Sequence, residues 1–437
     1  MTIWSIAVHF LLPFVIFNLL WRGIRYPAYW FRWPERFGYL EAMHGQRVIW
    51  VHAVSVGEVR SAAELVNELA DRFPRHRVLV TTMTPTGSQQ VHELFGDRVV
   101  HAYVPYDFPG SVRRFMTRVN PEFAVVAETE FWPNLFKACE DRNVPLFLVN
   151  VRLSQESLRR YLRIPRTARA MLERATLICA QTNSDAQRLK NLGVARPRIE
   201  VTGNLKFDAP LSGSLLAEAE TLRRQWGAGR PVVIAASTHA GEEKKILTAY
   251  QVLRQRYTDL LLVLVPRHPE RFKSVARLCR RHGACVALRS RHRGVLSSEI
   301  EILVGDTMGE LQRLYAAADI AFVGGSLVRT GGHNLLEPCA VGVPVIFGPH
   351  MFHFEEISTM VLERGAGSQV HDEVGLAESV AIYLEHPVLS EAAGEAARLL
   401  VAENRGAVAR TLQLMSESSR LSRAERQVSN SIPALHD

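Results

Sequence analysis

The sequence predicts an α/β protein with two doubly wound, parallel-sheet domains in series. Short apolar runs rich in Val and Ile alternate with amphipathic segments, which is the pattern of repeated β-α-β units. This alternation occurs twice, and a segment rich in Gly and Pro separates the two series. Several charged residues come directly after predicted strands, where ligands of such sheets bind.

Length and composition agree with this architecture. The 437 residues suffice for two or three domains, and 47% hydrophobic and 22% charged residues are typical of a globular protein. A formal net charge of +8 suits an anionic substrate, nucleic acid or an anionic membrane surface, without choosing among them. Five scattered cysteines lack metal-binding spacing and indicate a reducing environment.

The N-terminal segment is mostly apolar from residue 3 to residue 20. Arginines interleaved with aromatic residues follow it, starting at Arg22 and Arg25. A signal peptide would carry its charge before the apolar run and a small-residue cleavage site after it. The segment therefore predicts an anchor that spans the cytoplasmic membrane or lies in its interface, with the rest of the chain on the cytoplasmic side. The alternative is a buried N-terminal helix of a soluble domain.

The first series predicts seven strands, at residues 48–53, 77–82, 99–104, 123–128, 146–150, 177–181 and 199–203. Helices are expected between them, for example at residues 59–73 and 87–94. The second series predicts six strands, at residues 232–237, 260–266, 285–289, 302–304, 320–324 and 343–347. Residues 207–229 are the expected linker region because they contain several glycines and a proline.

These elements divide the chain into four expected parts. They are an anchor at residues 1–25, a first Rossmann-like domain at 26–210, a second at 211–415 and a flexible tail at 416–437. The tail is expected to be loose because it is rich in Ser and charge.

Four charged residues lie at predicted strand ends of the first domain: Glu58, Glu128, Glu130 and Lys206. Two carboxylates at one strand end are costly unless they face a polar cleft. A lysine there could meet negative charge on a substrate. Each residue alone could equally belong to a surface salt bridge. Their shared position favours a site, with Glu58 pointing into a cleft between the domains.

The most informative stretch of the second domain is GGSLVRTGGHNLLEPCAVGVPVIFGP, residues 324–349. Two glycine pairs precede His333, Asn334 and a helix expected to begin near Leu335. Glycines let backbone approach a ligand, and a helix N-terminus offers N–H groups to a phosphate. Glu337 could then accept the hydroxyls of a ribose. The alternative is a glycine-rich turn in which Glu337 only interacts with the helix dipole.

Two further strand ends of this domain carry candidate ligand-binding residues. Arg267 follows Pro266 in VPRHPERF and could bind a phosphate with two hydrogen bonds. Met308, Gly309 and Glu310 in GDTMGEL open the next predicted helix. For Glu310, a helix-dipole interaction is the alternative. Together these stretches favour nucleotide-sugar binding.

The chain resembles the 3-deoxy-D-manno-octulosonic acid (Kdo) transferase family from its N-terminal segment to about Arg410. The motifs that carry the resemblance are, in chain order, HAVSVGE, TTMTPTGS, YVPYD, ETEFWPNL, NVRLS, GNLKFD, VPRHPERF, VGDTMGEL and FVGGSLVRTGGHNLLEP. The resemblance implies a GT-B glycosyltransferase with an N-terminal acceptor domain and a C-terminal donor domain. It implies transfer of Kdo from CMP-Kdo to the lipid A precursor at the cytoplasmic face of the inner membrane, with no nucleic acid as partner.

The resemblance also implies roles for individual residues. Glu58 is the expected general base, and Glu128 and Lys206 are the expected transition-state stabilisers. The expected CMP-binding residues are Pro266, Arg267, Met308, Gly309, Glu310, Asn334, Leu335, Leu336 and Glu337. No cofactor is expected. No metal is expected either, because CMP leaves with a single phosphate and the sequence contains no Asp-x-Asp motif.

Two alternatives stay open at this point. One is a GT-B enzyme that uses another nucleotide sugar, such as a UDP-sugar, on a lipid acceptor. The other is a membrane-bound nucleotide-binding scaffold without turnover. If the acceptor is the lipid A precursor, surface arginines including Arg159 and Arg160 are expected to bind its phosphates.

Overall fold

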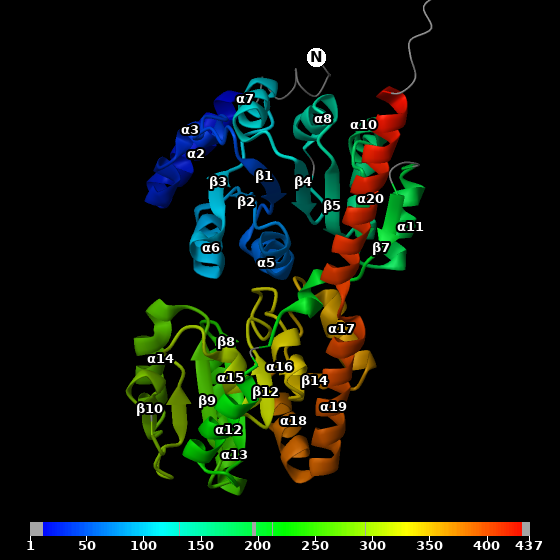
Figure 1. Cartoon of the computed structure of the whole chain (residues 1–437). Helices are drawn as coiled ribbons and strands as arrows, with labels where there is room; N and C mark the ends of the chain where they lie inside the picture. The colour runs from blue at the N-terminus through cyan, green and yellow to red at the C-terminus, as the bar shows by residue number, and fades with distance from the viewer. Residues whose placement is uncertain (1–11, 131, 195–197, 212, 293, 431–437) are drawn as a thin grey trace, which may run out of the picture. The chain divides into compact units, whose positions relative to one another are not determined.

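A computed structural model describes residues 12–130, 132–194, 198–211, 213–292 and 294–430. The chain forms two compact units. The first unit comprises Met1–Ala209 and Arg405–Asp437, and the second comprises Pro210–Asn404. Figure 1 shows a sheet flanked by helices in each of them.

The first unit is built on a seven-stranded parallel sheet in the order β3-β2-β1-β4-β5-β6-β7. Its strands are β1 (Arg47–His52), β2 (His76–Thr82), β3 (Val100–Tyr103), β4 (Phe123–Ala127), β5 (Leu146–Val151), β6 (Leu177–Ala180) and β7 (Arg198–Val201). Its larger helices are α2 (Leu12–Arg25), α5 (Ala63–Arg72), α6 (Pro85–Phe95), α7 (Pro109–Val119), α8 (Pro133–Asp141), α10 (Pro165–Leu172), α11 (Asn183–Asn191) and α20 (Ala407–Asn430). Shorter ones are η1 (Pro27–Trp30), α3 (Trp33–Arg36), α4 (Val56–Ser61), α9 (Gln155–Tyr161) and η3 (Leu205–Asp208).

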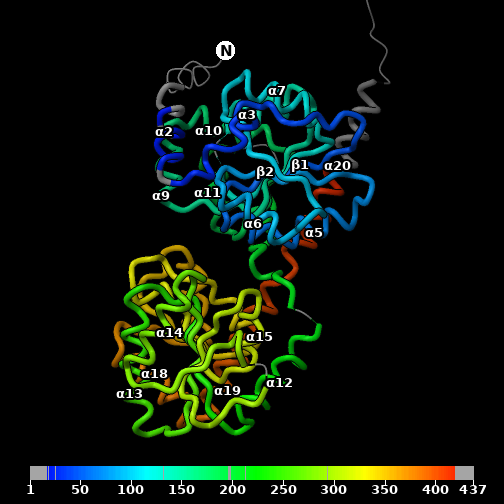
Figure 2. The backbone as a smooth tube through the Cα atoms, turned by 90° about the vertical axis from the view of Figure 1, so that its left-hand side faces the viewer, coloured from blue at the N-terminus to red at the C-terminus, as the bar shows by residue number. Residues whose placement is uncertain are grey.

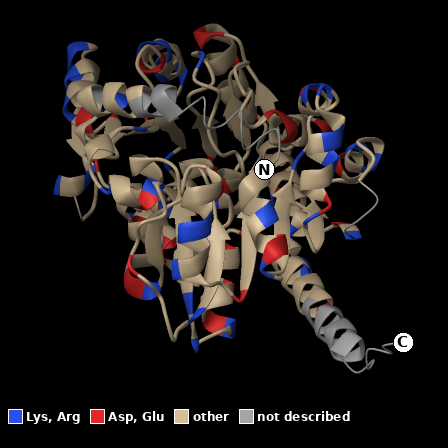
Figure 3. Ribbon diagram, turned by 90° about the horizontal axis from the view of Figure 1, so that it is seen from above, with Lys and Arg blue, Asp and Glu red and all other residues tan. Residues whose placement is uncertain are grey.

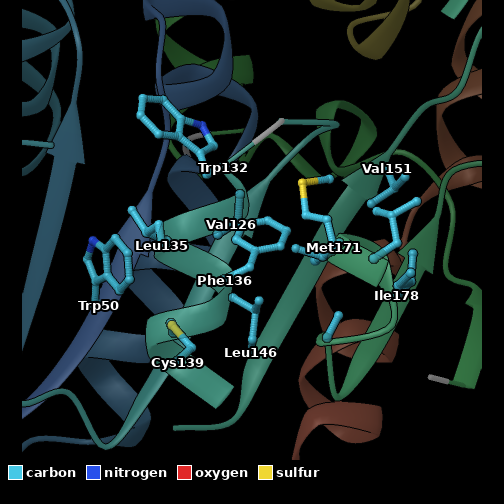
Figure 4. Close-up of a cluster of buried hydrophobic side chains, with 14 of the residues drawn as sticks. Trp50, Val126, Trp132, Leu135, Phe136, Cys139, Leu146, Val151, Met171 and Ile178 are labelled. Atoms are coloured by element: carbon cyan, nitrogen blue, oxygen red, sulfur yellow. The ribbon is translucent and has the colours of Figure 1, made fainter. Parts of the chain in front are cut away.

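Both faces of this sheet are covered, which is why its central strands are nearly continuous apolar runs. Trp50 and Val126 pack on one face with side chains of α8 and α10, as Figure 4 shows. Ile49 and Val125 pack on the opposite face. Trp132, which follows the end of β4, lies at the edge of the cluster in Figure 4.

The second unit repeats this plan with a parallel sheet in the order β10-β11-β9-β8-β12-β13-β14. Its strands are β8 (Val232–Thr238), β9 (Leu261–Pro266), β10 (Val286–Leu288), β11 (Ile302–Val304), β12 (Ile320–Val323), β13 (Val345–Phe347) and β14 (Gly367–Gln369). Its helices include η4 (Pro269–Arg271), α12 (Leu215–Trp226), α13 (Glu242–Arg256), α14 (Phe272–Arg281), α15 (Leu311–Ala316), α16 (Leu336–Ala340), α17 (Glu355–Glu363), α18 (Glu373–Glu385) and α19 (Pro387–Asn404).

Each strand predicted from the sequence is present, with ends within two residues of the expected ones. The short strand β14 was not predicted. The helix expected at residues 59–73 is divided at Ala62 into α4 and α5. The Ser61 hydroxyl donates to the carbonyl of Glu58 at 3.0 Å and so competes with the backbone for that acceptor.

The ends of the second unit differ from the expected domain boundaries. Residues 207–229 are not merely a linker, since Leu222 and Trp226 of α12 are buried in the core of the second unit. Beyond Arg405 the chain belongs to the first unit again, although residues up to 415 were expected in the second domain. There Leu412 and Met415 of α20 join the core of the first unit. The helix continues to Asn430, through most of the expected flexible tail.

Helix α2 is the described part of the predicted anchor, and residues 1–11 lie outside the described residues. Figure 2 shows α2 at one side of the first unit. Within the described ranges, no helix combines the length and apolar character needed to cross a bilayer.

Lys, Arg, Asp and Glu are interspersed over the helices and loops in Figure 3.

Candidate active site

Three of the four candidate residues of the first unit lie at the topological switch point of its sheet. The chain order of the strands reverses between β1 and β4, which are neighbours in Figure 1. Loops at the carboxyl ends of such strands diverge and leave a crevice where ligands bind. Glu58 follows β1 on α4, and Glu128 and Glu130 follow β4. The sheet therefore brings together carboxylates that are 70 residues apart in the chain.

Glu58 is held in a capping box at the start of α4. Ser55 is the N-cap, and its hydroxyl accepts a hydrogen bond from the Glu58 amide at 3.3 Å. The carboxylate of Glu58 in turn accepts from the Val54 amide at 2.6 Å and from the Ser55 hydroxyl at 2.9 Å. The side chain is thus fixed in one orientation, and the residue is only 7% exposed.

The pKa of Glu58 is raised to about 8, far above that of an ordinary glutamate. Burial is the largest cause, and the negative charges of Glu130 and Glu128 add to it. The hydrogen bonds from Val54 and Ser55 act in the opposite direction and are outweighed. A carboxyl group that only capped a helix would be solvated and acidic. The raised pKa of Glu58 is of the kind found at functional sites.

Glu128 and Glu130 form the second part of this acidic group. Glu128 has a φ of +60°, a left-handed conformation that is strained for glutamate, and its amide donates to the Val149 carbonyl. Glu130 accepts a hydrogen bond from the Trp132 indole at 3.1 Å. Its pKa is raised to about 6, because burial and the charge of Glu128 outweigh the indole hydrogen bond. The mutual charge effects show that Glu58, Glu128 and Glu130 lie near one another, and their role as a site stays a prediction.

Lys206 lies in η3, beyond the end of β7, and η3 packs against α4. A chain of three amide side chains positions it. Asn150 accepts from the Leu205 amide at 3.0 Å, and Asn204 accepts from the Lys206 amide at 3.0 Å. Gln181 connects the two by donating to the Asn150 carbonyl and accepting from the Asn204 amide group. The sequence identified Lys206 but missed this support, because the three residues come from different strands and loops.

Asn150 is expected to be intolerant of alanine for a backbone reason. It is fully buried, and its φ of +56° is left-handed. Asn150→Gly and Asn150→Ala both remove the bond to the Leu205 amide, but only Ala meets the steric cost of this φ. Asn150→Ala should therefore be less stable than Asn150→Gly by about 1 kcal/mol in urea unfolding. Equal stabilities would contradict a constrained backbone at this position.

In the second unit, the candidate residues surround the switch point between β8 and β12. Glu242 bridges it and is completely buried. Its carboxylate accepts hydrogen bonds from four backbone amides, those of His239, Gly325, Ser326 and Leu327, at 2.7–3.0 Å. The backbone amides of Gly325, Ser326 and Leu327 therefore donate to the side chain of Glu242. The sequence did not reveal this arrangement.

The glycines of this loop are required by close packing. A Cβ at Gly324 would lie 2.7 Å from the Ser237 carbonyl oxygen. A Cβ at Gly331 would lie 2.1 Å from His353, and the φ of Gly331 is +100°. The loop between β12 and α16 is thus folded tightly onto its neighbours.

The predicted CMP-binding residues occupy three loops of the second unit. Pro266 ends β9, and the amide of Arg267 donates to the Thr238 carbonyl at 3.0 Å. Met308 is 67% exposed, and Gly309 has a φ of +77°. Their position at strand ends on the same side as the switch point follows from the parallel sheet.

Four of these predicted residues are engaged mainly within the protein. Glu310 is the N-cap of α15 and pairs with Arg289 and Arg313. Leu335 and Leu336 are buried, so their backbone rather than their side chains is left for a ligand. Asn334 accepts from the Leu336 amide at 3.1 Å and donates to Glu337 at 3.3 Å. It thereby opens α16 and orients Glu337.

No group of three or more His, Cys, Asp or Glu residues with a metal-holding arrangement occurs in the part of the chain that the structure describes.

Two Rossmann-like units with strand-end sites define a protein of the GT-B class. The fold agrees with that of UDP-GlcNAc 2-epimerase from Neisseria meningitidis, at a TM-score of 0.56 and 16% identity over 85% of this chain and 99% of that one. A glycosyltransferase from Rickettsia africae gives a TM-score of 0.54, at 14% identity over 86% of this chain and 99% of that one.

The sequence comparisons are more specific. Residues 31–209 match the family model of 3-deoxy-D-manno-octulosonic-acid transferase (kdotransferase). The chain is 41% identical to the 3-deoxy-D-manno-octulosonic acid transferase of Haemophilus influenzae, over 90% of this chain and 92% of that protein. Identity to the enzyme of the same name from Bordetella pertussis is 36%, over 95% of this chain and 98% of that protein. This chain belongs to the Kdo transferase family and is a glycosyltransferase of lipopolysaccharide biosynthesis.

Proposed function

We propose that the protein transfers Kdo from CMP-Kdo to the lipid A precursor, with inversion at the anomeric carbon and release of CMP. The observation that carries this proposal is the buried carboxyl of Glu58, which Val54 and Ser55 hold by hydrogen bonds near the carboxylates of Glu128 and Glu130. A sugar hydroxyl is a weak nucleophile at neutral pH and needs a base to take its proton. Family membership supports Kdo as the transferred sugar.

In the proposed reaction, Glu58 accepts the proton of the acceptor hydroxyl as this oxygen attacks the anomeric carbon of Kdo. The bond from that carbon to the CMP phosphate oxygen breaks in the same displacement. Positive charge that develops on the sugar is stabilised by Glu128, and Lys206 balances negative charge on the substrates. The amide chain of Asn150, Gln181 and Asn204 keeps Lys206 in place.

The second unit is the proposed donor-binding unit. Arg267, which follows β9, meets the phosphate of CMP with its guanidinium group. Asn334 and Glu337 at the start of α16 contribute hydrogen bonds to the nucleotide. Pro266, the loop from Met308 to Glu310, and the backbone of Leu335 and Leu336 complete the site.

The protonation of Glu58 predicts the pH dependence of the reaction. A base whose pKa is about 8 is mostly protonated at pH 6, so kcat/KM should rise about tenfold per pH unit and level off above pH 8. Glu130→Gln removes a negative charge that raises the pKa of Glu58, so this rise should move to lower pH. Kinetics between pH 5.5 and 9 measure it. Glu68→Gln, a control on α5 whose side chain is partly exposed and pairs with Arg72, should leave the profile unchanged, and an unmoved profile in Glu130→Gln would contradict the charge coupling.

The proposed location is the cytoplasmic face of the inner membrane. Helix α2 and the following η1 expose large apolar side chains, among them Phe17, Trp21, Ile24 and Trp30. Such a surface, next to several arginines, fits the headgroup region of an anionic bilayer. Trp21→Ser with Ile24→Ser should reduce co-flotation with phosphatidylglycerol vesicles. Flotation equal to that of the wild type would argue against this surface as the docking site.

The donor and acceptor are tested directly by incubating the purified protein with lipid A precursor and either CMP-Kdo or UDP-GlcNAc. Mass spectrometry of the lipid should show added Kdo only with CMP-Kdo. Transfer of GlcNAc would instead identify a UDP-sugar enzyme. CMP binding without any transfer would identify a non-catalytic scaffold.

A further inference from the structure

Three histidines meet at the switch point of the second unit. His239 follows β8, His268 follows Arg267 after β9, and His333 lies directly before Asn334. The Nε2 atoms of His239 and His333 are 2.8 Å apart. The planes of the two rings are inclined by only 9°, and their centroids are 5.0 Å apart. The ring of His268 stands perpendicular to that of His239 at 5.3 Å.

The loop packing holds the two hydrogen-bonded imidazoles together. The amide of His239 donates to Glu242, which also binds the amide of Gly325. Any side chain at Gly325 would collide with the ring of His333, because its Cβ would lie 2.9 Å from Cδ2. The pair of His239 and His333 is therefore positioned by buried structure rather than by solvent contacts.

A hydrogen bond between two Nε2 atoms holds a single hydrogen. One imidazole donates it and the other accepts it with a lone pair. The pair can therefore carry no more than one positive charge while this contact exists. A charged pair would have its extra proton on an Nδ1 atom or shared between the rings.

The charged groups around the pair change the pKa at which it binds an extra proton. Burial lowers the pKa of His239, and the nearby His268, Arg267 and Arg271 lower it further. Glu243 acts in the opposite direction, although its carboxylate is also paired with Arg271. The carboxylate of Glu242 accepts hydrogen bonds from the backbone amides of His239 and Gly325. This surplus of positive charge favours the neutral form of His239, and a bound anion would favour the charged form.

We propose that His239 and His333 form one proton-sharing pair, which takes up a proton when the donor nucleotide binds and delivers it to the departing phosphate oxygen. The inference rests on the proposed function. It deepens that function by assigning a general acid to the donor unit.

The proposed step balances as follows. The bond between the anomeric carbon and the phosphate oxygen breaks, and its electron pair goes to that oxygen, which takes the proton of the pair. The acceptor oxygen bonds to the anomeric carbon and loses its proton to Glu58. CMP leaves as a monoanion, the pair becomes neutral, and Glu58 becomes protonated. A phosphate monoester has a second pKa of about 6, so a histidine is a matched donor for it.

Proton uptake can be measured without turnover. CMP binding to the full chain is followed by calorimetry at pH 7 in two buffers of different ionisation enthalpy. The wild type should take up a fraction of a proton per CMP, and His333→Gln should take up almost none. The matched control is His371→Gln, an exposed residue of the same unit, which should behave like the wild type. Equal uptake by His333→Gln and the wild type would overturn the proposal.

Turnover separates catalysis from a structural role. His333→Gln should lower kcat with CMP-Kdo about 100-fold while the KM for CMP-Kdo changes little. His239→Gln should have a similar effect, and the double variant should be no worse than either single one, because the pair acts as a unit. An unchanged kcat in both single variants would overturn the proposal, whereas a wild type that neither binds CMP nor transfers Kdo would instead refute the proposed function.

Discussion

Glu58→Gln is expected to reduce kcat about 1000-fold without unfolding the protein. Gln has the shape of the protonated carboxyl but cannot accept a proton from the acceptor hydroxyl, and general-base catalysis contributes about 10²–10⁴-fold. Its carbonyl oxygen can still accept from the Val54 amide, and its amide group can donate to Ser55, so the start of α4 should survive. Steady-state kinetics at pH 8 measure the loss.

Two comparisons distinguish this role from a purely structural capping role. Glu68→Gln on the neighbouring α5 should retain wild-type kcat. If Glu58 only capped α4, its Gln variant would also keep most of its activity and would lose less than about 1 kcal/mol of stability. A Glu58→Gln enzyme with more than a tenth of the wild-type kcat would refute the general-base assignment.

The same variant should alter how stability depends on pH. The folded pKa of Glu58 is about 8, above that of an unfolded glutamate. Between these two values the folded state binds more protons, so the wild type loses stability as pH rises toward 8, and the loss levels off above that pH. Glu58→Gln lacks this group and should gain stability over the wild type in that range. Thermal unfolding at pH 6 and pH 8.5 measures the difference.

Glu242→Ala should have the largest effect on stability in the second unit. The substitution leaves the buried amides of His239, Gly325, Ser326 and Leu327 without their acceptor. A buried donor without a partner costs about 1–3 kcal/mol, so a total loss of at least about 3 kcal/mol is expected. The loop after β12 should open, and CMP binding should weaken with it.

Amide hydrogen exchange measures this prediction at the affected positions. Peptides that cover residues 324–327 should lose protection in Glu242→Ala, while peptides from the first unit should not change. Glu378→Ala, at an exposed position of α18, provides the matched control. Unchanged protection in residues 324–327 would show that Glu242 does not hold the loop.

Local patterns predicted the strands well because fully buried parallel strands must be apolar on both faces. The same patterns singled out the carboxylates after β1 and β4, because charge at a strand end has few structural uses, and their functional role stays a prediction. They were less successful with helices that depend on distant partners. Helix α12 looked like part of a linker, and the first part of α20, up to residue 415, was expected in the second domain, although its apolar side chains pack in the core of the first unit.

The sequence by itself determined the two-fold repetition of β-α-β units, the residues at their strand ends and the family to which the chain belongs. Only the tertiary structure decided which of those residues act on one another. Glu130 raises the pKa of Glu58, Glu242 binds the loop of Gly325, and His239 meets His333. The physical reason is that burial and electrostatic coupling depend on distances in space. Those distances arise where the strand order reverses, between segments that are dozens of residues apart in the chain.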